Sequence, residues 1–183
     1  MNRHLDNLID IFDQQKLWIA LRSVCDNPQQ ELRVEMPYVD VGQAQHMDAS
    51  MLGASAFEPG SLAVTDRMSH FTCRKQKWRF LKAFDKRIVR RDLTPANQFV
   101  AYFVRYSLRL LKSAAYSLNP DTEYDIYFTR LLRTIRRMNA VWDALSPGYK
   151  FAPMDSLPID NQMLAFEPRY HVILEAYLAC EAI

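Results

Sequence analysis

Apolar residues recur at helical spacing in the first and last parts of the chain. Over residues 3–24 they come mostly three to five positions apart, which predicts one amphipathic helix. A similar stripe over residues 162–181 predicts a last helix, for which Pro168 is an alternative starting point because proline disrupts a helix interior. The two ends of the chain are therefore predicted to be helical.

The longest apolar stripes lie between these ends, over residues 95–117 and 121–145. Thr94 and Pro95 form a strong start signal, with threonine at the N-cap and proline at the first helical position. The connection to the second helix, around Pro120, is only a few residues long. Helices joined by so short a connection pack as an antiparallel hairpin, so we expect this hairpin to be the centre of the fold.

Strand patterns are weaker and shorter. Residues 31–36 alternate strictly between polar and apolar, as a half-buried strand does, and Pro37 makes this an edge strand or its end. Residues 38–41 could continue it, and residues 61–64 could form a second strand. The small and polar residues 42–60 are predicted to be a loop.

The periodicity of residues 70–91 is mixed. Trp78, Leu81 and Phe84 are spaced as on a helix, whereas Trp78, Phe80 and Lys82 are spaced as on a strand. We favour a helix here. The fold class predicted is then mainly α with a small β element: a helical bundle around the 95–117 and 121–145 hairpin, with short strands within residues 30–65.

The net charge of +2 hides a strong asymmetry. Residues 1–66 carry 4 basic and 10 acidic side chains, residues 67–137 carry 17 and 5, and residues 138–183 carry 2 and 6. The chain thus divides into an acidic region, 1–66, and a helical domain, 67–183, that contains the basic part; one continuous domain is the alternative. Such asymmetry favours contact with nucleic acid or with an acidic protein, unless the acidic ends fold back on the basic middle.

The basic side chains fall into three groups, and a cationic surface of this kind binds phosphate backbones without reading bases. The first group is Arg74, Lys75, Lys77, Arg79, Lys82, Lys86, Arg87, Arg90 and Arg91; the second is Arg105, Arg109 and Lys112; the third is Arg130, Arg133, Arg136 and Arg137. If the last two groups face the same way, seven cations form one stripe across the hairpin. Trp78 and Phe80 could stack unpaired bases, or pack in the core.

Motifs for catalysis are missing from the sequence. It has no Walker A motif, no G-x-G-x-x-G and no G-x-S-x-G. His70 and Cys73 have H-x-x-C spacing, but two ligands without a second pair do not make a zinc site. His171 lies four residues from Glu167 and from Glu175, which is typical of a surface interaction on a helix. We therefore predict no enzyme activity, no metal and no cofactor.

Three features together resemble one family. They are the stretch R-D-L-T-P-A-N-Q-F-V at residues 91–100, the long paired helices after it, and the stretch S-L-P-I-D-N-Q-M-L at 156–164 followed by P-R-Y-H-V-I-L-E-A-Y at 168–177. This pattern resembles McrC-like proteins, the partner subunits of McrB-type NTPase restriction systems. The likeness covers about residues 85–180.

The resemblance implies a helical region that usually precedes a PD-(D/E)XK nuclease domain. That nuclease needs two carboxylates and a lysine, yet no Glu-x-Lys occurs in the sequence, and residues 31–33 and 167–169 carry arginine instead. The resemblance therefore implies the nuclease-free accessory part, whose N-terminal region contacts the motor partner. Metal-dependent nuclease activity relying on Asp121 or Asp160 would show that a site has been missed.

The function predicted is a non-enzymatic, nucleic-acid-binding adaptor of a McrBC-like restriction or defence system. It would bind DNA in preference to RNA, and an NTPase subunit, but neither a membrane nor a small-molecule substrate. The polar N-terminus and three widely spaced cysteines favour a cytoplasmic protein. Two alternatives remain: a pure protein-interaction module, and a helical ribonucleoprotein subunit similar in role to the small subunits of CRISPR effector complexes.

Overall fold

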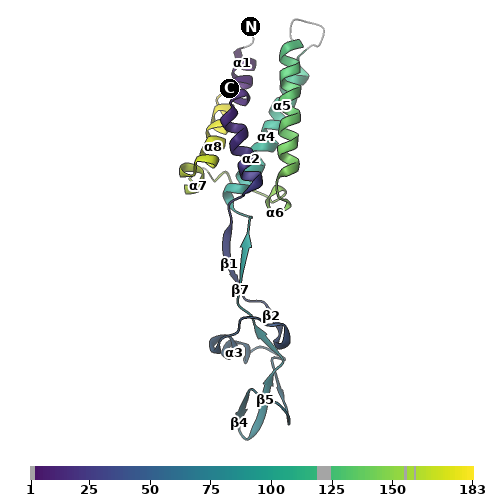
Figure 1. The fold of residues 1–183 in the computed structure, drawn as a ribbon, viewed down its shortest axis with the longest axis vertical. Coiled ribbons are helices and arrows are strands. Elements are labelled where there is room, and N and C mark those ends of the chain that lie inside the picture. The colour runs from purple at the N-terminus through teal and green to yellow at the C-terminus, as the bar shows by residue number, and fades with distance from the viewer. Residues whose placement is uncertain (1–2, 119–124, 155, 159) are drawn as a thin grey trace. The chain divides into compact units, whose positions relative to one another are not determined.

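The computed structural model describes residues 3–118, 125–154, 156–158 and 160–183. The chain divides into two compact units (Figure 1). The helical unit consists of residues 1–31 and 91–183, and the β unit consists of residues 32–90. These boundaries differ from the 1–66 and 67–183 regions that the charge distribution suggests, because the β unit is inserted between two parts of the helical unit.

The helical unit contains helices where the apolar stripes predict them. They are α1 (Arg3–Asp13), α2 (Gln15–Asp26), α4 (Pro95–Ser117), α5 (Asp125–Ala144), α7 (Gln162–Phe166) and α8 (Pro168–Glu181). The short helix α6 (Pro147–Lys150) is not predicted by any stripe, and the last predicted helix is divided into α7 and α8, the second of which begins at Pro168. The single helix expected over residues 3–24 is wrong, since it breaks at Gln14. At this break the Trp18 indole N–H donates to the carbonyl of Phe12 over 2.6 Å.

The predicted antiparallel hairpin of α4 and α5 is confirmed among the described residues. The start of α4 lies beside the end of α5, where the Ser146 hydroxyl donates to the Asp92 carboxylate. Thr94 caps α4 as expected, because its hydroxyl accepts from the Asn97 N–H over 3.3 Å. Residues 121–124, predicted to begin the second helix, lie outside the described residues.

One hydrophobic core joins α1, α2, α4, α5 and α8. Phe12, Phe99 and Phe103 are almost fully buried in it, and the Tyr177 ring meets Phe99 edge-on at 5.6 Å. None of the helices in the described part of the chain has the length and apolarity needed to cross a lipid bilayer. The fold class, mainly α with a small β element, is confirmed.

A buried polar network anchors the points at which the chain leaves and re-enters the helical unit. The Asn97 side chain is fully buried; its amide donates to the carbonyls of Gln29, at 2.8 Å, and Asp92, at 2.6 Å. Its oxygen accepts from the Tyr170 hydroxyl at 2.5 Å. That hydroxyl in turn accepts from the Gln29 N–H at 2.9 Å. Asn97 therefore links the segment after α2 to the segment before α4.

The β unit is built from short strands around one short helix. Its elements are β1 (Glu31–Glu35), β2 (Tyr38–Asp40), η1 (Val41–Gln43), α3 (Ala49–Ser55), β3 (Leu62–Val64), β4 (Phe71–Cys73), β5 (Gln76–Phe80), β6 (Lys82–Phe84) and β7 (Arg87–Arg91). β1 pairs with β7, β2 pairs antiparallel with β6, and β3, β5 and β4 form a three-stranded antiparallel sheet.

Two sequence predictions for this unit are wrong. The helix favoured over residues 70–91 is four strands, and the loop expected over residues 42–60 contains α3. Asp48 caps α3 by accepting from the Met51 N–H over 2.9 Å. The strands predicted at residues 31–36, 38–41 and 61–64 are confirmed as β1, β2 and β3.

Candidate nucleic-acid interface

The β4–β5 hairpin turns on two basic residues in a left-handed backbone conformation. Arg74 and Lys75 connect the strands with φ of 49° and 64°, and Cys73 pairs with Gln76 across the turn. A two-residue hairpin turn with both φ values positive normally carries asparagine and glycine. Non-glycine residues in this conformation cost on the order of 1–3 kcal/mol each. The tip is thus strained while it holds two cations.

The register of the three-stranded sheet sorts its side chains onto two faces, since alternate residues of a strand point to opposite sides. Lys77 lies opposite Thr72, and Arg79 lies opposite Ala63, so these four share one face. Trp78 lies between Phe71 on β4 and Val64 on β3, on the other face. The sheet therefore has a cationic face and an aromatic face.

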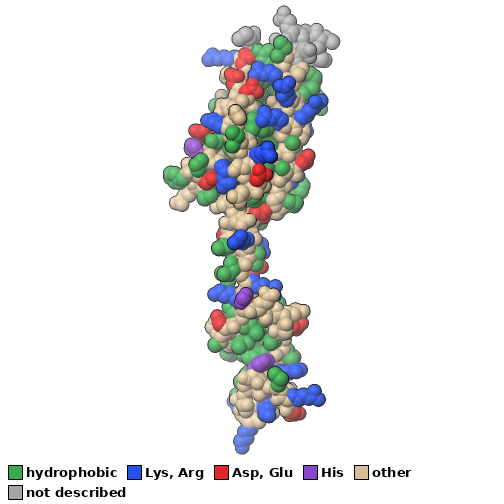
Figure 2. Space-filling model, in the orientation of Figure 1, with side chains coloured by type: hydrophobic (Ala, Val, Ile, Leu, Met, Phe, Trp, Pro, Cys, Tyr) green, Lys and Arg blue, Asp and Glu red, His purple; other side chains and the backbone are tan. Residues whose placement is uncertain are grey.

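We call Arg74, Lys75, Lys77 and Arg79 the hairpin cations. All of them are exposed. Within the described part of the chain, none of these side chains has an acidic partner at ion-pair distance. Figure 2 shows Lys and Arg side chains at the surface of this part of the β unit. These four side chains can therefore each pair with an anionic group of a ligand without first breaking an ion pair within the described part of the chain.

The aromatic face remains open to solvent. Phe71 is 37% exposed and Val64 is 54% exposed, although both are large and apolar. A shallow hollow of about 360 Å³ lies on this face, and it is lined by Leu62, Phe71, Cys73, Arg74, Gln76 and Trp78. Phe71 and the half-buried Trp78 thus present ring surface at this hollow, next to the Arg74 side chain.

Phe80, predicted to stack bases, does not belong to the open surface. It is only 8% exposed, and its ring lies 5.7 Å from Phe71 and 6.0 Å from His70. Its N–H donates to His70 Nδ1 over 2.9 Å, which gives His70 a structural role. Phe71 takes the place predicted for Phe80, because it lies opposite Trp78 in the register of β4 and β5, a pairing that alternation within one strand does not reveal.

The other basic residues predicted over residues 74–91 differ in their surroundings. Arg87 pairs with the buried Asp85 at 2.7 Å, and Lys86 lies beside Asp48 in a small hollow. Arg91, which belongs to the helical unit, has an interaction partner within the chain. Lys82 and Arg90 are exposed, as the hairpin cations are, and are equally available to a ligand.

Asp85 fixes the loop that precedes α3. Its carboxylate accepts from the His46 N–H at 2.7 Å, the Arg87 Nε at 2.7 Å and the Gln45 N–H at 3.1 Å. The hydrogen bond from His46 and the neighbouring Arg87 hold the pKa of this carboxyl below its usual range. The charged form is therefore the one that stabilises the β unit.

This lowered pKa predicts the acid sensitivity of the β unit. Because the folded pKa is depressed, the stabilisation is present above the unfolded value of about 3.9 and is lost as pH falls through the folded value. In an NMR titration, the amide signals of Gln45 and His46 should show a common acid transition as the pH falls below about 4. Asp85→Asn should remove this acid transition, whereas Asp40→Asn should leave it; an acid transition that survives Asp85→Asn contradicts the assignment.

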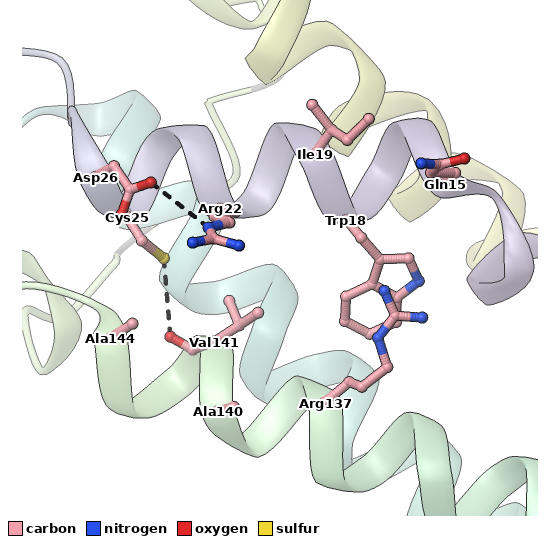
Figure 3. A pocket seen from close by; sticks show the side chains of 10 residues that line it. All are labelled: Gln15, Trp18, Ile19, Arg22, Cys25, Asp26, Arg137, Ala140, Val141 and Ala144. Carbon is pink, nitrogen blue, oxygen red and sulfur yellow. Dashed lines mark hydrogen bonds and ion pairs between the residues drawn. The ribbon is translucent and has the colours of Figure 1, made fainter.

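Two members of the basic groups of the helical hairpin make contacts within the helical unit. Arg130 pairs with Asp13 of α1, and the Arg137 guanidinium lies over the Trp18 ring of α2, 3.9 Å from its centroid (Figure 3). Lys112 lines a hollow between α4 and α5. The seven-cation stripe stays a prediction, although part of the charge of Arg130 and Arg137 is used within the helical unit. Arg105, Arg109, Arg133 and Arg136 are exposed.

Arg137 belongs to a groove of about 520 Å³ between α2 and α5. Figure 3 shows Trp18, Ile19 and Val141 along it, with the Arg22–Asp26 pair at 3.8 Å toward one end. Cys25 lies in this wall and donates to the Val141 carbonyl over 3.9 Å, and burial raises the pKa of its thiol to about 11. The thiol is therefore unreactive at neutral pH.

The acidic candidates for catalysis have structural or surface roles. Glu167 caps α8 by accepting from the N–H groups of Arg169 and Tyr170, and His171 makes the expected surface pair with Glu175, at 3.5 Å. Asp160 is exposed, and Asp121 lies outside the described residues. No cluster of three metal-ligating side chains occurs in the described ranges.

Comparison of the chain with protein-family models, with curated proteins and with solved structures finds no match. The case for the candidate interface therefore rests on the exposed hairpin cations and on the register of the β3–β5–β4 sheet.

Proposed function

We propose that this chain is a nucleic-acid-binding adaptor that contacts phosphates through the hairpin cations. The observation that carries the proposal is the strained tip at Arg74 and Lys75. Glycine or asparagine would relieve the strain at these two positions, so folding alone does not favour two cations there. Lys77 and Arg79 continue the charge along the adjoining face.

The wider setting follows from the sequence resemblance. The likeness to McrC-like proteins supports a role as an accessory component of a restriction or defence assembly, with an NTPase as partner, DNA as the favoured nucleic acid and the cytoplasm as location. The helical unit would then be the scaffold that carries the β unit to its ligand. The same chain needs no catalytic site for this role.

Salt dependence tests the proposal. Four neutralised phosphates give a slope of about −3 for the logarithm of affinity against the logarithm of salt. Affinity for a labelled oligonucleotide should therefore fall about 60-fold between 50 and 200 mM salt, measured by fluorescence anisotropy. If the chain shows no measurable binding at the lower salt concentration, the proposed function is refuted.

A protein-interaction module is the second candidate, because the β unit exposes large apolar side chains away from the hairpin. Phe57 and Met68 are 90% and 89% exposed. A partner complex that excess nucleic acid leaves intact would favour this candidate, whereas competition between them would favour the first.

A further inference from the structure

The aromatic face of the β3–β5–β4 sheet has the chemistry of a nucleobase platform. Phe71 and Trp78 supply rings, and Arg74 and Gln76 also line the hollow beside them. Aromatic rings stack on any base, while guanidinium and amide groups bind base edges or phosphates. The hollow's volume of about 360 Å³ lies at the small end of ligand sites.

The arrangement of the two faces restricts which nucleic acid can use both. The hairpin cations Lys77 and Arg79 lie on one side of a single sheet, and Phe71 and Trp78 lie on the other. A sheet with its side chains is about 10 Å thick, the distance at which sheets pack on one another. A ligand that contacts both sides must therefore turn around the edge of the hairpin within about this distance. Duplex DNA has a persistence length of about 500 Å and keeps its bases stacked inside, so it reaches only one face.

We propose that the sheet binds single-stranded nucleic acid, with unpaired bases on Phe71 and Trp78 and the backbone continuing around the tip to the hairpin cations. This inference rests on the proposed function and adds the class of ligand. Arg74 connects the two halves of the site, because it belongs to the tip and also lines the aromatic hollow. The sheet itself engages only bases and phosphates, so it accepts DNA and RNA strands alike; the preference for DNA in the proposed function rests on the resemblance to McrC-like proteins, not on this sheet.

The test compares a single strand of about 16 nucleotides, as DNA and as RNA, with a duplex of equal length. Phe71→Leu and Trp78→Leu remove a ring but keep an apolar side chain in the sheet, whereas Trp78→Phe keeps a ring. Each leucine variant should bind the single strand at least about 5-fold more weakly, as the loss of one stacked base requires, with duplex binding unchanged. Trp78→Phe should bind nearly as the wild type does.

Phe57→Leu is the matched control, since Phe57 is 90% exposed in the same unit but outside its strands. Phe57→Leu should leave the affinities for the single strand and for the duplex unchanged. Thermal unfolding of every variant identifies any that fails to fold, and Phe71 and Trp78 provide two independent positions.

The possible outcomes separate this inference from the proposed function. A chain that binds neither strand nor duplex overturns both. Binding that depends on salt but is the same for duplex and single strand, or is untouched by Phe71→Leu and Trp78→Leu, overturns the single-strand inference and leaves the backbone contacts standing. In that case the aromatic face serves a protein partner or a second copy of the chain.

Discussion

Neutralising all four hairpin cations is expected to weaken nucleic-acid binding at least about 100-fold at 0.1 M salt. The variant replaces Arg74, Lys75, Lys77 and Arg79 with glutamine. Each replacement removes one phosphate neutralisation, so the salt slope should fall by about 3, to near zero. The substitutions also relieve charge crowding at the strained tip, so we expect the fold to stay intact. Far-UV circular dichroism of the variant checks this expectation.

A matched variant on the helical unit decides where the interface lies. Arg105, Arg109, Lys112 and Arg133 are also exposed, and their replacement with glutamine gives the same net charge as the hairpin variant. It should lower affinity by less than about 5-fold, since only the general field of the protein changes. If this variant loses binding while the hairpin variant retains it, the interface lies on the helical unit and the hairpin assignment is wrong.

The helical unit was predictable because several local signals agree there. Over residues 95–117 the apolar stripe, the Thr94 cap and Pro95 all indicate the same helix, and the structure has it at Pro95–Ser117. The break at Gln14 was missed because neither glycine nor proline marks it. What fixes it is the contact of Trp18 with the Phe12 carbonyl, which depends on the folded structure.

The β unit was harder to predict because its signals conflict. Residues 76–84 fit both a period of 2 and a helical period, and the turn at Arg74 and Lys75 lacks the glycine or asparagine that identifies a hairpin. The cationic residues were found from composition alone. Their separation from the aromatic side chains onto opposite faces follows from the strand register, and a helical interpretation of the same residues hides it.

Burial in the β unit also differs from what its sequence suggests. Among its described hydrophobic residues only Met51, Phe80 and Ala83 are buried. The sequence thus predicts Phe80 as a binding residue although the small core needs it, and it does not distinguish the exposed Phe71. Sequence patterns identify which residues share a face, but the exposed fraction depends on which elements cover that face.

Asn97→Ala is expected to lower the free energy of unfolding of the helical unit by about 2–4 kcal/mol. The substitution removes three hydrogen bonds of the Asn97 side chain, which is fully buried. The Asp92 carbonyl keeps the Thr94 N–H and the Tyr170 hydroxyl keeps the Gln29 N–H, so the Gln29 carbonyl is the group that loses most. A buried polar group left unpaired costs more than a hydrogen bond gains. Urea unfolding followed by the helical circular dichroism signal measures the loss.

Tyr170→Phe provides the graded control, because it removes one hydroxyl from the same network and should cost only about 1–2 kcal/mol. A loss below about 1 kcal/mol for Asn97→Ala would show that the network is weak or rehydrated. Since Asn97 joins the segments that precede β1 and follow β7, its loss should act on stability alone. At temperatures where the Asn97→Ala chain stays folded, the hairpin should bind nucleic acid with wild-type affinity, which separates the role of Asn97 in folding from that of the hairpin in binding.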